Sequence, residues 1–274
     1  MPPVTHALVT GASAGIGAAF ARELAARGHA LVLVARRADR LEALATELRA
    51  RHGVAVECIA CDLADPHTPQ FLLDQTTRRG IAIDMLINNA GYGVTGSLVS
   101  REWRTHEHFI QVMIAAPTEL CHRFVPGMRE RGYGRIVNVA SFAGLMPAPA
   151  GHTLYAASKA FLIRFSEALA LENRAYGINV CALCPGFTLS EFHDVTGSRK
   201  TVSQMPKWLW LDADEVARDG LDAVERGTIV RIVGARYRLI KAMFKLLPDP
   251  IALRLIAAYS GNFRVVRPAG RDGG

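Results

Sequence analysis

Long apolar runs are missing from the sequence, and so are other features that would assign it to a specialised class of protein. No uncharged stretch approaches the roughly eighteen apolar residues that a membrane-spanning helix requires. Aromatic residues make up only 7% of the chain, and they are not interleaved with basic residues as in nucleic-acid-binding modules. We therefore expect a protein that neither crosses a bilayer nor binds nucleic acid.

Cysteine is also scarce. The five cysteines are an odd number without disulfide-type spacing, and the start of the chain lacks a basic leader followed by an apolar stretch. We therefore expect a reducing, cytoplasmic setting. Two Cys-x-x-Cys pairs, Cys58 with Cys61 and Cys181 with Cys184, resemble the halves of a zinc site. Both lie in predicted strands, where residues three apart point to opposite faces, so no metal site is predicted.

What remains is the composition of an ordinary globular protein. The 274 residues are 50% hydrophobic and 21% charged, which excludes a disordered or collagen-like chain. The net charge is +7, and residues 228–274 account for all of it, with nine Lys or Arg against two Asp. The basic segment is therefore separate from a body that is close to neutral.

Short apolar runs alternate along the chain with longer stretches of helical periodicity. This alternation is typical of repeated βαβ units, in which helices connect parallel strands. The sequence therefore predicts an α/β fold with a doubly wound, mostly parallel sheet of seven strands flanked by helices. The expected strands are Ala7–Thr10, Ala30–Ala35, Val54–Ala60, Met85–Asn88, Arg135–Val139, Asn179–Cys184 and Ile229–Val233. The expected helices are Ile16–Arg27, Ala38–Arg51, Pro69–Arg79, Trp103–Arg131, Tyr155–Ala175 and Asp214–Glu225.

No linker or internal repeat divides the chain before the basic segment. We expect one catalytic domain over residues 1–234 and a basic helical extension over residues 235–274. In the extension, Arg238, Lys241 and Lys245 share one helical face, and apolar residues line another. That apolar face comprises Leu239, Met243 and Leu246, widened by Ile240, Phe244 and Leu247. Packing beside the substrate segment or on a partner subunit is the favoured interpretation, and weak contact with an anionic membrane or an acidic acyl carrier is the alternative.

A glycine-rich turn follows the first predicted strand and opens directly into a helix. It reads Thr10-Gly11-Ala12-Ser13-Ala14-Gly15-Ile16-Gly17. Glycines permit a tight turn and a close backbone approach, so that a pyrophosphate can rest on the N–H groups of the helix N-terminus. The lysine of a nucleotide-triphosphate-binding P-loop is absent after Gly17, which disfavours a nucleoside triphosphatase.

The spacing of these glycines and an ordered set of later motifs resemble the short-chain dehydrogenase/reductase family. The likeness runs from about Val4 to about Val233 and includes Asp62-Leu63, Asn88-Asn89-Ala90-Gly91, Ser141, Tyr155-x-x-x-Lys159 and Pro185-Gly186-Phe187-Thr188. The resemblance implies a Rossmann-type sheet, a nicotinamide cofactor and the interconversion of carbonyls and alcohols.

The predicted catalytic residues are Ser141, Tyr155 and Lys159. Tyr and Lys four apart lie on one face of a helix, so the Lys159 ammonium is expected to lower the pKa of the Tyr155 phenol. Tyr155 would then act as the acid or base, while Ser141, at a strand end, hydrogen-bonds the developing alkoxide. By the resemblance, Lys159 also holds the nicotinamide ribose.

The end of the second strand indicates which cofactor binds. An acidic residue there binds a ribose 2′-hydroxyl, whereas an arginine accommodates a 2′-phosphate. This chain has Ala35 followed by Arg36 and Arg37, which favours NADP(H). By resemblance, Asp62 and Leu63 border the adenine and Thr188 the nicotinamide carboxamide. The full set of cofactor-binding candidates is Thr10, Gly11, Ser13, Gly15, Ile16, Gly17, Arg36, Arg37, Asp62, Leu63, Asn89, Ala90, Gly91, Tyr155, Lys159, Pro185, Gly186 and Thr188.

Two departures from the family pattern are visible. The family usually has an Asn twenty-eight residues before the serine, where it helps hold a water that joins the lysine to solvent, and this chain has Met113. A thioether cannot replace an amide that donates and accepts hydrogen bonds. The spacing from Ser141 to Tyr155 is fourteen, where thirteen is more familiar. This puts the geometry of the intervening loop in question rather than the roles of the two residues.

The leading interpretation is an NADPH-dependent carbonyl reductase or alcohol dehydrogenase. The expected substrate segment, about residues 187–211, is strongly apolar and favours a lipophilic substrate such as a 3-oxoacyl thioester, a steroid-like ketone or an aromatic ketone. His152 and His193 are further candidates for the substrate mouth, although ordinary loop histidines are the more common case. Apolar residues on the two long helices, such as Leu162, Phe165 and Leu169, predict a homodimer or homotetramer.

One alternative function stays open, and another is less well supported. Because Met113 replaces the usual Asn, the chain is also compatible with a catalytically weak NADP(H)-binding sensor or scaffold. A nucleotide-sugar epimerase or dehydratase is disfavoured, since that fingerprint usually has Gly-x-x-Gly-x-x-Gly spacing.

Overall fold

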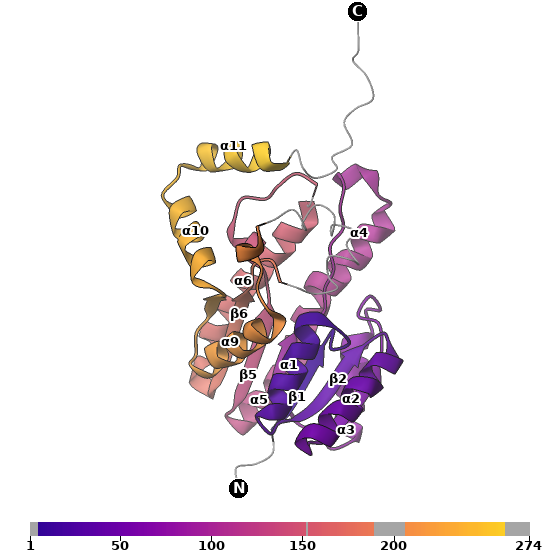
Figure 1. The fold of residues 1–274 in the computed structure, drawn as a ribbon. Coiled ribbons are helices and arrows are strands. Elements are labelled where there is room, and N and C mark those ends of the chain that lie inside the picture. Colours follow the sequence, from indigo (N-terminus) through magenta and orange to yellow (C-terminus); the bar gives the residue numbers. More distant parts are fainter. Residues whose placement is uncertain (1–4, 152, 189–205, 261–274) are drawn as a thin grey trace, which may run out of the picture.

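The computed structural model describes residues 5–151, 153–188 and 206–260. Seven parallel strands form one sheet in the order β3-β2-β1-β4-β5-β6-β7 (Figure 1). The predicted α/β, Rossmann-type, doubly wound fold is therefore confirmed. The strands are β1 (His6–Thr10), β2 (Ala30–Ala35), β3 (Val56–Ala60), β4 (Ile83–Asn88), β5 (Gly134–Val139), β6 (Ile178–Cys184) and β7 (Val230–Ile232).

Helices cover both faces of this sheet. The main helices of the body are α1 (Gly15–Ala26), α2 (Ala38–His52), α3 (Thr68–Arg78), α4 (Trp103–Ile110), α5 (Ala116–Arg131), α6 (Thr153–Asn173) and α9 (Ala213–Glu225). In Figure 1, α1, α2 and α9 lie in front of the strands. Their buried side chains, among them Phe20, Leu41 and Leu221, form one apolar layer, and residues of α3 and α5 such as Leu72 and Leu120 form the other. Because both faces are covered, the central strands are apolar on both sides, which explains their unbroken apolar runs.

The long helix expected over residues 103–131 is interrupted. A single π-helical turn, Gln111–Ala115, separates α4 from α5. Pro117 explains the break: it has no N–H to donate to the carbonyl of Met113 four residues earlier, and its ring crowds that carbonyl. The Thr118 hydroxyl donates to the Ile114 carbonyl at 2.7 Å, which satisfies one of the groups freed by the wider turn.

Two helices, α10 (Ala235–Lys245) and α11 (Asp249–Ser260), follow the last strand. The favoured expectation was that Leu239, Met243 and Leu246 pack beside the substrate segment or on a partner subunit. Within this chain they are 63%, 59% and 86% exposed, so the first of these is wrong, and packing on a partner subunit stays a prediction. Tyr237, which is only 2% exposed, faces the body instead. The face of α10 that contacts the body is therefore the face that carries Tyr237 and not the predicted leucine and methionine face, because the Tyr237 ring fills a site next to Gly186 at the end of β6.

No helix in the described part of the chain is both long enough and apolar enough to span a membrane.

Candidate active site

A cavity of about 860 Å³ lies where the strands of the sheet end at their carboxyl side. The strand order reverses between β1 and β4, and sheets of this kind bind ligands at that point. Most of the lining residues fall into two groups, and the remaining ones include Asn89, Ser141, Tyr155, Lys159 and Thr188. The glycine-turn half is lined by residues in the last positions of β2 or just after β1, β2 and β3: Gly11, Ser13, Ala14, Gly15, Ile16, Val34, Ala35, Arg36, Arg37, Cys61, Asp62, Leu63 and Ala64. The apolar half is lined by Tyr92, His108, Val112, Phe142, Met146, Pro147, Pro149, Phe187, Tyr237 and Ile256.

The glycine turn is tied to the end of β4 by Asn89. The Asn89 amide Nδ2 donates to the carbonyl of Thr10 at 2.9 Å and to that of Gly11 at 3.3 Å. Gly11 has a φ of +67°, a conformation that L side chains rarely adopt. A Cβ added to Gly17 would lie 2.2 Å from the Gly11 carbonyl oxygen, so only glycine fits there.

Thr10 and Gly17 are the two predicted cofactor-binding residues that do not line the cavity. Thr10 is buried, and its hydroxyl accepts the backbone N–H groups of Asn89 and Ala90 at 3.0 and 3.1 Å and donates to the Ile87 carbonyl at 3.2 Å. Thr10 and Gly17 shape the glycine turn, and the other cofactor-binding candidates predicted from the sequence line the cavity. Asn89 does both.

The N-terminus of α1 faces the cavity without a side-chain cap. Its cap residue, Ala14, makes no side-chain hydrogen bond, and no acidic residue lies in the first turn of the helix. The first N–H groups of a helix carry a partial positive charge and bind anions. This end of the cavity is therefore suited to a phosphate group.

Two arginines add positive charge beside that turn. The Arg37 guanidinium donates to the Ser13 hydroxyl at 3.0 and 3.3 Å, and Arg36 lies 3.8 Å from a carboxylate oxygen of Asp62. All four side chains line the cavity. The Arg36 side chain is 72% exposed, so its guanidinium can turn toward a ligand phosphate with little loss from a weak surface ion pair.

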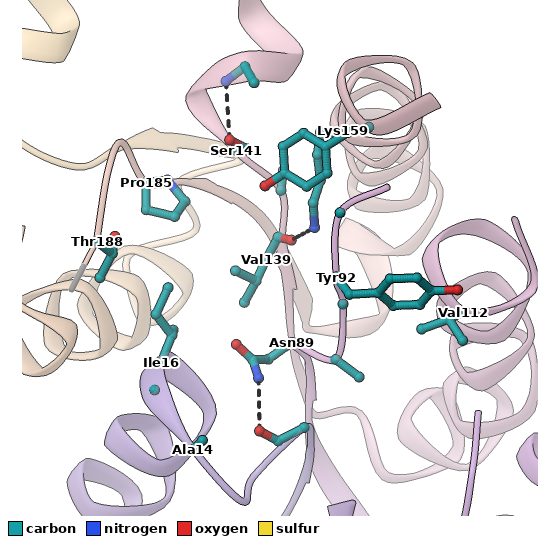
Figure 2. Close-up of a pocket in the computed structure, with 18 of the residues that line it drawn as sticks. Ala14, Ile16, Asn89, Tyr92, Val112, Val139, Ser141, Lys159, Pro185 and Thr188 are labelled. Carbon is teal, nitrogen blue, oxygen red and sulfur yellow. Dashed lines mark hydrogen bonds between the residues drawn. The ribbon is translucent and has the colours of Figure 1, made fainter. Parts of the chain in front are cut away.

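Ser141, Tyr155 and Lys159 meet at the end of β5. The Lys159 ammonium, on the buried side of α6, donates to the Val139 carbonyl at 2.7 Å. The Ser141 hydroxyl accepts the Ala143 N–H at 3.1 Å and is also hydrogen-bonded to Tyr155. In Figure 2, Asn89 lies between the glycine turn near Ala14 and the group that holds Ser141 and Lys159. The longer loop between Ser141 and Tyr155 thus still brings the two hydroxyls together.

The electrostatics of this group differ from the expectation drawn from the sequence. Burial raises the pKa of Tyr155, with the Ser141 hydrogen bond acting in the opposite direction. Burial lowers the pKa of Lys159 to about 8. The Lys159 ammonium lies 5.8 Å from the Tyr155 ring centroid, so at this distance desolvation outweighs the charge that was expected to lower the pKa of the phenol.

Met113 lies next to this group but not in the cavity wall. A Cβ placed at Gly91 would lie 3.0 Å from the Met113 Sδ and 3.8 Å from the Lys159 Nζ, so the thioether and the ammonium border the same point. Met113 is 1% exposed. The position usually held by an amide that binds water is therefore filled by a buried apolar side chain.

Sequence reasoning missed most of the apolar half. Tyr92 follows β4, His108 and Val112 come from the α4 region, Phe142 to Pro149 come from the loop after β5, and Tyr237 and Ile256 come from the two C-terminal helices. These residues are spread over several separate segments, so no single short motif contains them. Of the predicted substrate segment, Phe187 and Thr188 line the cavity; Leu189, Phe192, Val195 and Met205, like His152 and His193, lie outside the described residues.

The described residues contain no group of three or more His, Cys, Asp or Glu side chains placed to hold a metal ion. Burial raises the pKa of the Cys61 thiol to about 11 and that of Cys58 to about 12.

Comparison with known proteins places this geometry in context. A family model described as short chain dehydrogenase matches residues 5–200. A short-chain dehydrogenase from Sphingobium yanoikuyae, solved in complex with NADPH, superposes with a TM-score of 0.78 at 35% identity, covering 90% of this chain and 97% of that chain. The bulky-bulky ketone specific alcohol dehydrogenase from Comamonas testosteroni gives a TM-score of 0.73 at 30% identity, covering 90% and 96% of the two chains.

Among curated proteins, a short chain dehydrogenase of Pseudocercospora fijiensis is 34% identical over 206 residues, which cover 73% of this chain and 65% of that relative. The chain spans about half to two thirds of the length of several curated relatives that it matches.

Proposed function

The chain belongs to the short-chain dehydrogenase/reductase family, and from this we propose that it is an NADPH-dependent carbonyl reductase, reversible as an alcohol dehydrogenase. The observation that carries the proposal is the meeting of Ser141, Tyr155 and Lys159 at the junction of the two halves of the cavity. A reductase needs a proton donor and an oxyanion partner beside a bound cofactor, and these three side chains supply them.

The residues of the glycine-turn half fit a dinucleotide with a 2′-phosphate. The close approach of Gly11 and Gly17 leaves no room for side chains, and the uncapped N-terminus of α1 offers N–H groups to a pyrophosphate. Arg36 and Arg37 would hold the 2′-phosphate, and Asp62 and Leu63 would border the adenine. The similar chain from Sphingobium yanoikuyae was solved with NADPH, which supports the same choice here.

When bound, NADPH supplies the hydride that reduces the carbonyl carbon. Tyr155 gives its phenol proton to the carbonyl oxygen, and the high pKa that burial gives the phenol keeps it protonated for this task. The Ser141 hydroxyl holds the same oxygen through a hydrogen bond. Lys159, fixed by the Val139 carbonyl, places its positive charge behind the phenolate that remains.

The proposed substrate is a lipophilic ketone or the matching secondary alcohol. Support comes from the apolar half, where Phe142, Met146 and Phe187 face the cavity with Tyr237 and Ile256. The alcohol dehydrogenase from Comamonas testosteroni is named for bulky-bulky ketones, which agrees with a wide apolar site.

A ketone panel of increasing chain length, run with NADPH, tests this function. We expect turnover to rise with the apolar area that each ketone buries, about 25 cal/mol per Å². A clear preference for small charged ketones would contradict the proposed substrate class. NADPH that binds but is never oxidised by any ketone would favour the second candidate, a sensor or scaffold, which the buried Met113 beside Lys159 supports.

The proposal includes a cytoplasmic setting and self-association. All five cysteines are free thiols, as a reducing compartment requires. Leu162 packs in the core of its own chain, whereas Phe161 and Leu171 of α6 are exposed and available to a second copy. We propose a homodimer or homotetramer, and light scattering at micromolar concentration tests it, with a monomer mass as the contrary result.

We also propose weak contact between the basic extension and an anionic surface. Leu239, Met243, Leu253 and Leu255 are exposed beside Arg238 and other cations of α10 and α11, which favours a lipid bilayer over an acidic acyl carrier. Sedimentation with anionic and with neutral vesicles tests this contact. Negligible pelleting in both would contradict it.

A further inference from the structure

A single hydroxyl group joins three segments of the chain beside the catalytic residues. The Tyr237 hydroxyl, from the first turn of α10, accepts the backbone N–H of Phe187 at 2.9 Å and donates to the Leu209 carbonyl at 2.6 Å. Burial raises the pKa of this phenol, so it stays protonated and able to make the second of these bonds. The C-terminal extension is thereby tied to both described ends of the segment that begins after Gly186 and returns at Leu209.

The ring of Tyr237 makes an equally specific contact. A Cβ added to Gly186 would lie 1.8, 2.2 and 2.4 Å from three carbons of the Tyr237 ring. The ring therefore occupies the space that a side chain at position 186 would need, and it also packs against Phe142 with centroids 5.0 Å apart. The Tyr237 ring can occupy this position only because residue 186 is a glycine.

Neighbouring contacts hold the same arrangement in place. Arg236 donates to the Trp210 carbonyl at 2.8 Å, and the Leu211 N–H donates to the Phe187 carbonyl at 2.7 Å. Thr188 and Leu211 form an isolated parallel bridge. Thr188 is almost fully buried and its hydroxyl donates to the Gly186 carbonyl at 3.1 Å. The position of Thr188 in the cavity wall is therefore fixed from the side of α10.

We infer that Tyr237 is a positioning residue, which holds Phe187 and Thr188 at the place where the nicotinamide end of the cofactor meets the substrate. The inference rests on the proposed function, because it is NADPH that Thr188 would contact. It also means that residues 235–260 complete the active site of the body. Ile256 of α11, which lines the apolar half, extends the same wall.

The affinities of two ligands distinguish a positioning role of Tyr237 from a role in overall folding stability. NADPH would occupy both halves of the cavity, whereas adenosine 2′,5′-bisphosphate carries the adenosine with its 2′- and 5′-phosphates but no nicotinamide riboside, and would reach only the glycine-turn half. Tyr237→Phe keeps the ring on Gly186 and removes both bonds of the hydroxyl. We expect it to weaken NADPH binding about 2- to 12-fold, the range that corresponds to the net loss of one hydrogen bond. Binding of the bisphosphate should stay as in the wild type.

The measurement is calorimetric titration of both ligands, with thermal melting of each variant as the check on folding. Tyr176→Phe, at an exposed tyrosine far from the cavity, is the matched control and should leave both affinities unchanged. Arg236→Gln, which removes the bond to the Trp210 carbonyl, should weaken NADPH in the same selective way and serves if Tyr237→Phe does not fold.

Equal losses for the two ligands, or no loss of NADPH affinity in a folded Tyr237→Phe, would overturn the inference. A wild-type protein that binds neither ligand would instead contradict the proposed cofactor, so the two failures are distinguishable.

Discussion

The two halves of the cavity are made from very different parts of the sequence. The glycine-turn half comes from three short runs of residues at the ends of β1, β2 and β3, and the first run is rich in glycine. The apolar half is assembled from α4, the loop after β5, the strand end at Phe187 and the two C-terminal helices. In the glycine-turn half, the conformation of the backbone restricts which residue types can stand at neighbouring positions. In the apolar half, any apolar side chain of suitable size can line the cavity, and these side chains come from segments far apart in the sequence. A sequence motif can therefore describe the glycine-turn half, whereas no motif describes the apolar half.

The largest effect is expected where the two halves meet. Tyr155→Phe removes the transferable proton and keeps the ring, so NADPH should still bind while turnover falls by at least about 10²-fold. Parallel measurement of ketone turnover and NADPH affinity checks this. Unchanged turnover would exclude Tyr155 from the mechanism, and a parallel loss of NADPH affinity would mean that the Tyr155 hydroxyl also contributes to cofactor binding.

Arg36→Ala tests the glycine-turn half alone. Loss of charge-assisted hydrogen bonds to a 2′-phosphate costs roughly 1.5–3 kcal/mol, or about ten- to a hundredfold in NADPH affinity. NADH has no 2′-phosphate, so its affinity should not change. Titration of wild type and variant with both cofactors is the measurement. A wild type that binds NADH as tightly as NADPH would defeat the assignment before any variant is made.

The pKa of Lys159 gives activity and stability opposite responses to pH. The folded-state pKa is about 8, below the ordinary value of 10.5, so the unfolded chain binds more protons between these values and the free energy of unfolding should rise with pH across that window. The kcat/KM for ketone reduction should fall above about pH 8, because the neutral amine no longer supports the phenolate of Tyr155. Urea unfolding of the cofactor-free protein and a pH-rate profile provide the two curves. A kcat/KM that stays flat up to pH 10 would show that the charge of Lys159 is not needed.

Met113→Asn has the smallest expected effect. It restores an amide beside Lys159 and Gly91, so turnover should stay the same or rise a few-fold. Met113→Leu, which keeps an apolar side chain of similar size, is the control and should match the wild type. A severe loss in the Asn variant with an unaffected Leu variant would show that Lys159 depends on a dry neighbour.

The fold, and the meeting of Ser141, Tyr155 and Lys159, were accessible from the sequence because they depend on local patterns. Each of these patterns depends on residues close together in the sequence. The patterns are the periodicity of the strands and helices, the glycine turn and the Tyr155-x-x-x-Lys159 spacing. The break at Gln111–Ala115 was not predicted, although Pro117 signalled it. The pKa direction of Tyr155 was also missed, because burial is a property of the packed site and not of the helix that carries the residue.

The inward face of α10 was missed for a similar reason. Hydrophobic spacing selected Leu239, Met243 and Leu246, but the body offers a site shaped for one ring, above Gly186, and Tyr237 fills it. Only the meeting of two distant segments reveals that contact.

The central claim is that the two halves of the cavity work as one reductase site, and isotope transfer tests it most directly. Wild-type protein is incubated with a long-chain ketone and NADPH carrying deuterium at both C4 positions of the nicotinamide, and the products are examined by mass spectrometry. We expect an alcohol with one deuterium on the carbinol carbon, and almost none from Tyr155→Phe. Bound NADPH that retains all of its deuterium across the ketone panel, with no labelled alcohol, would contradict the claim.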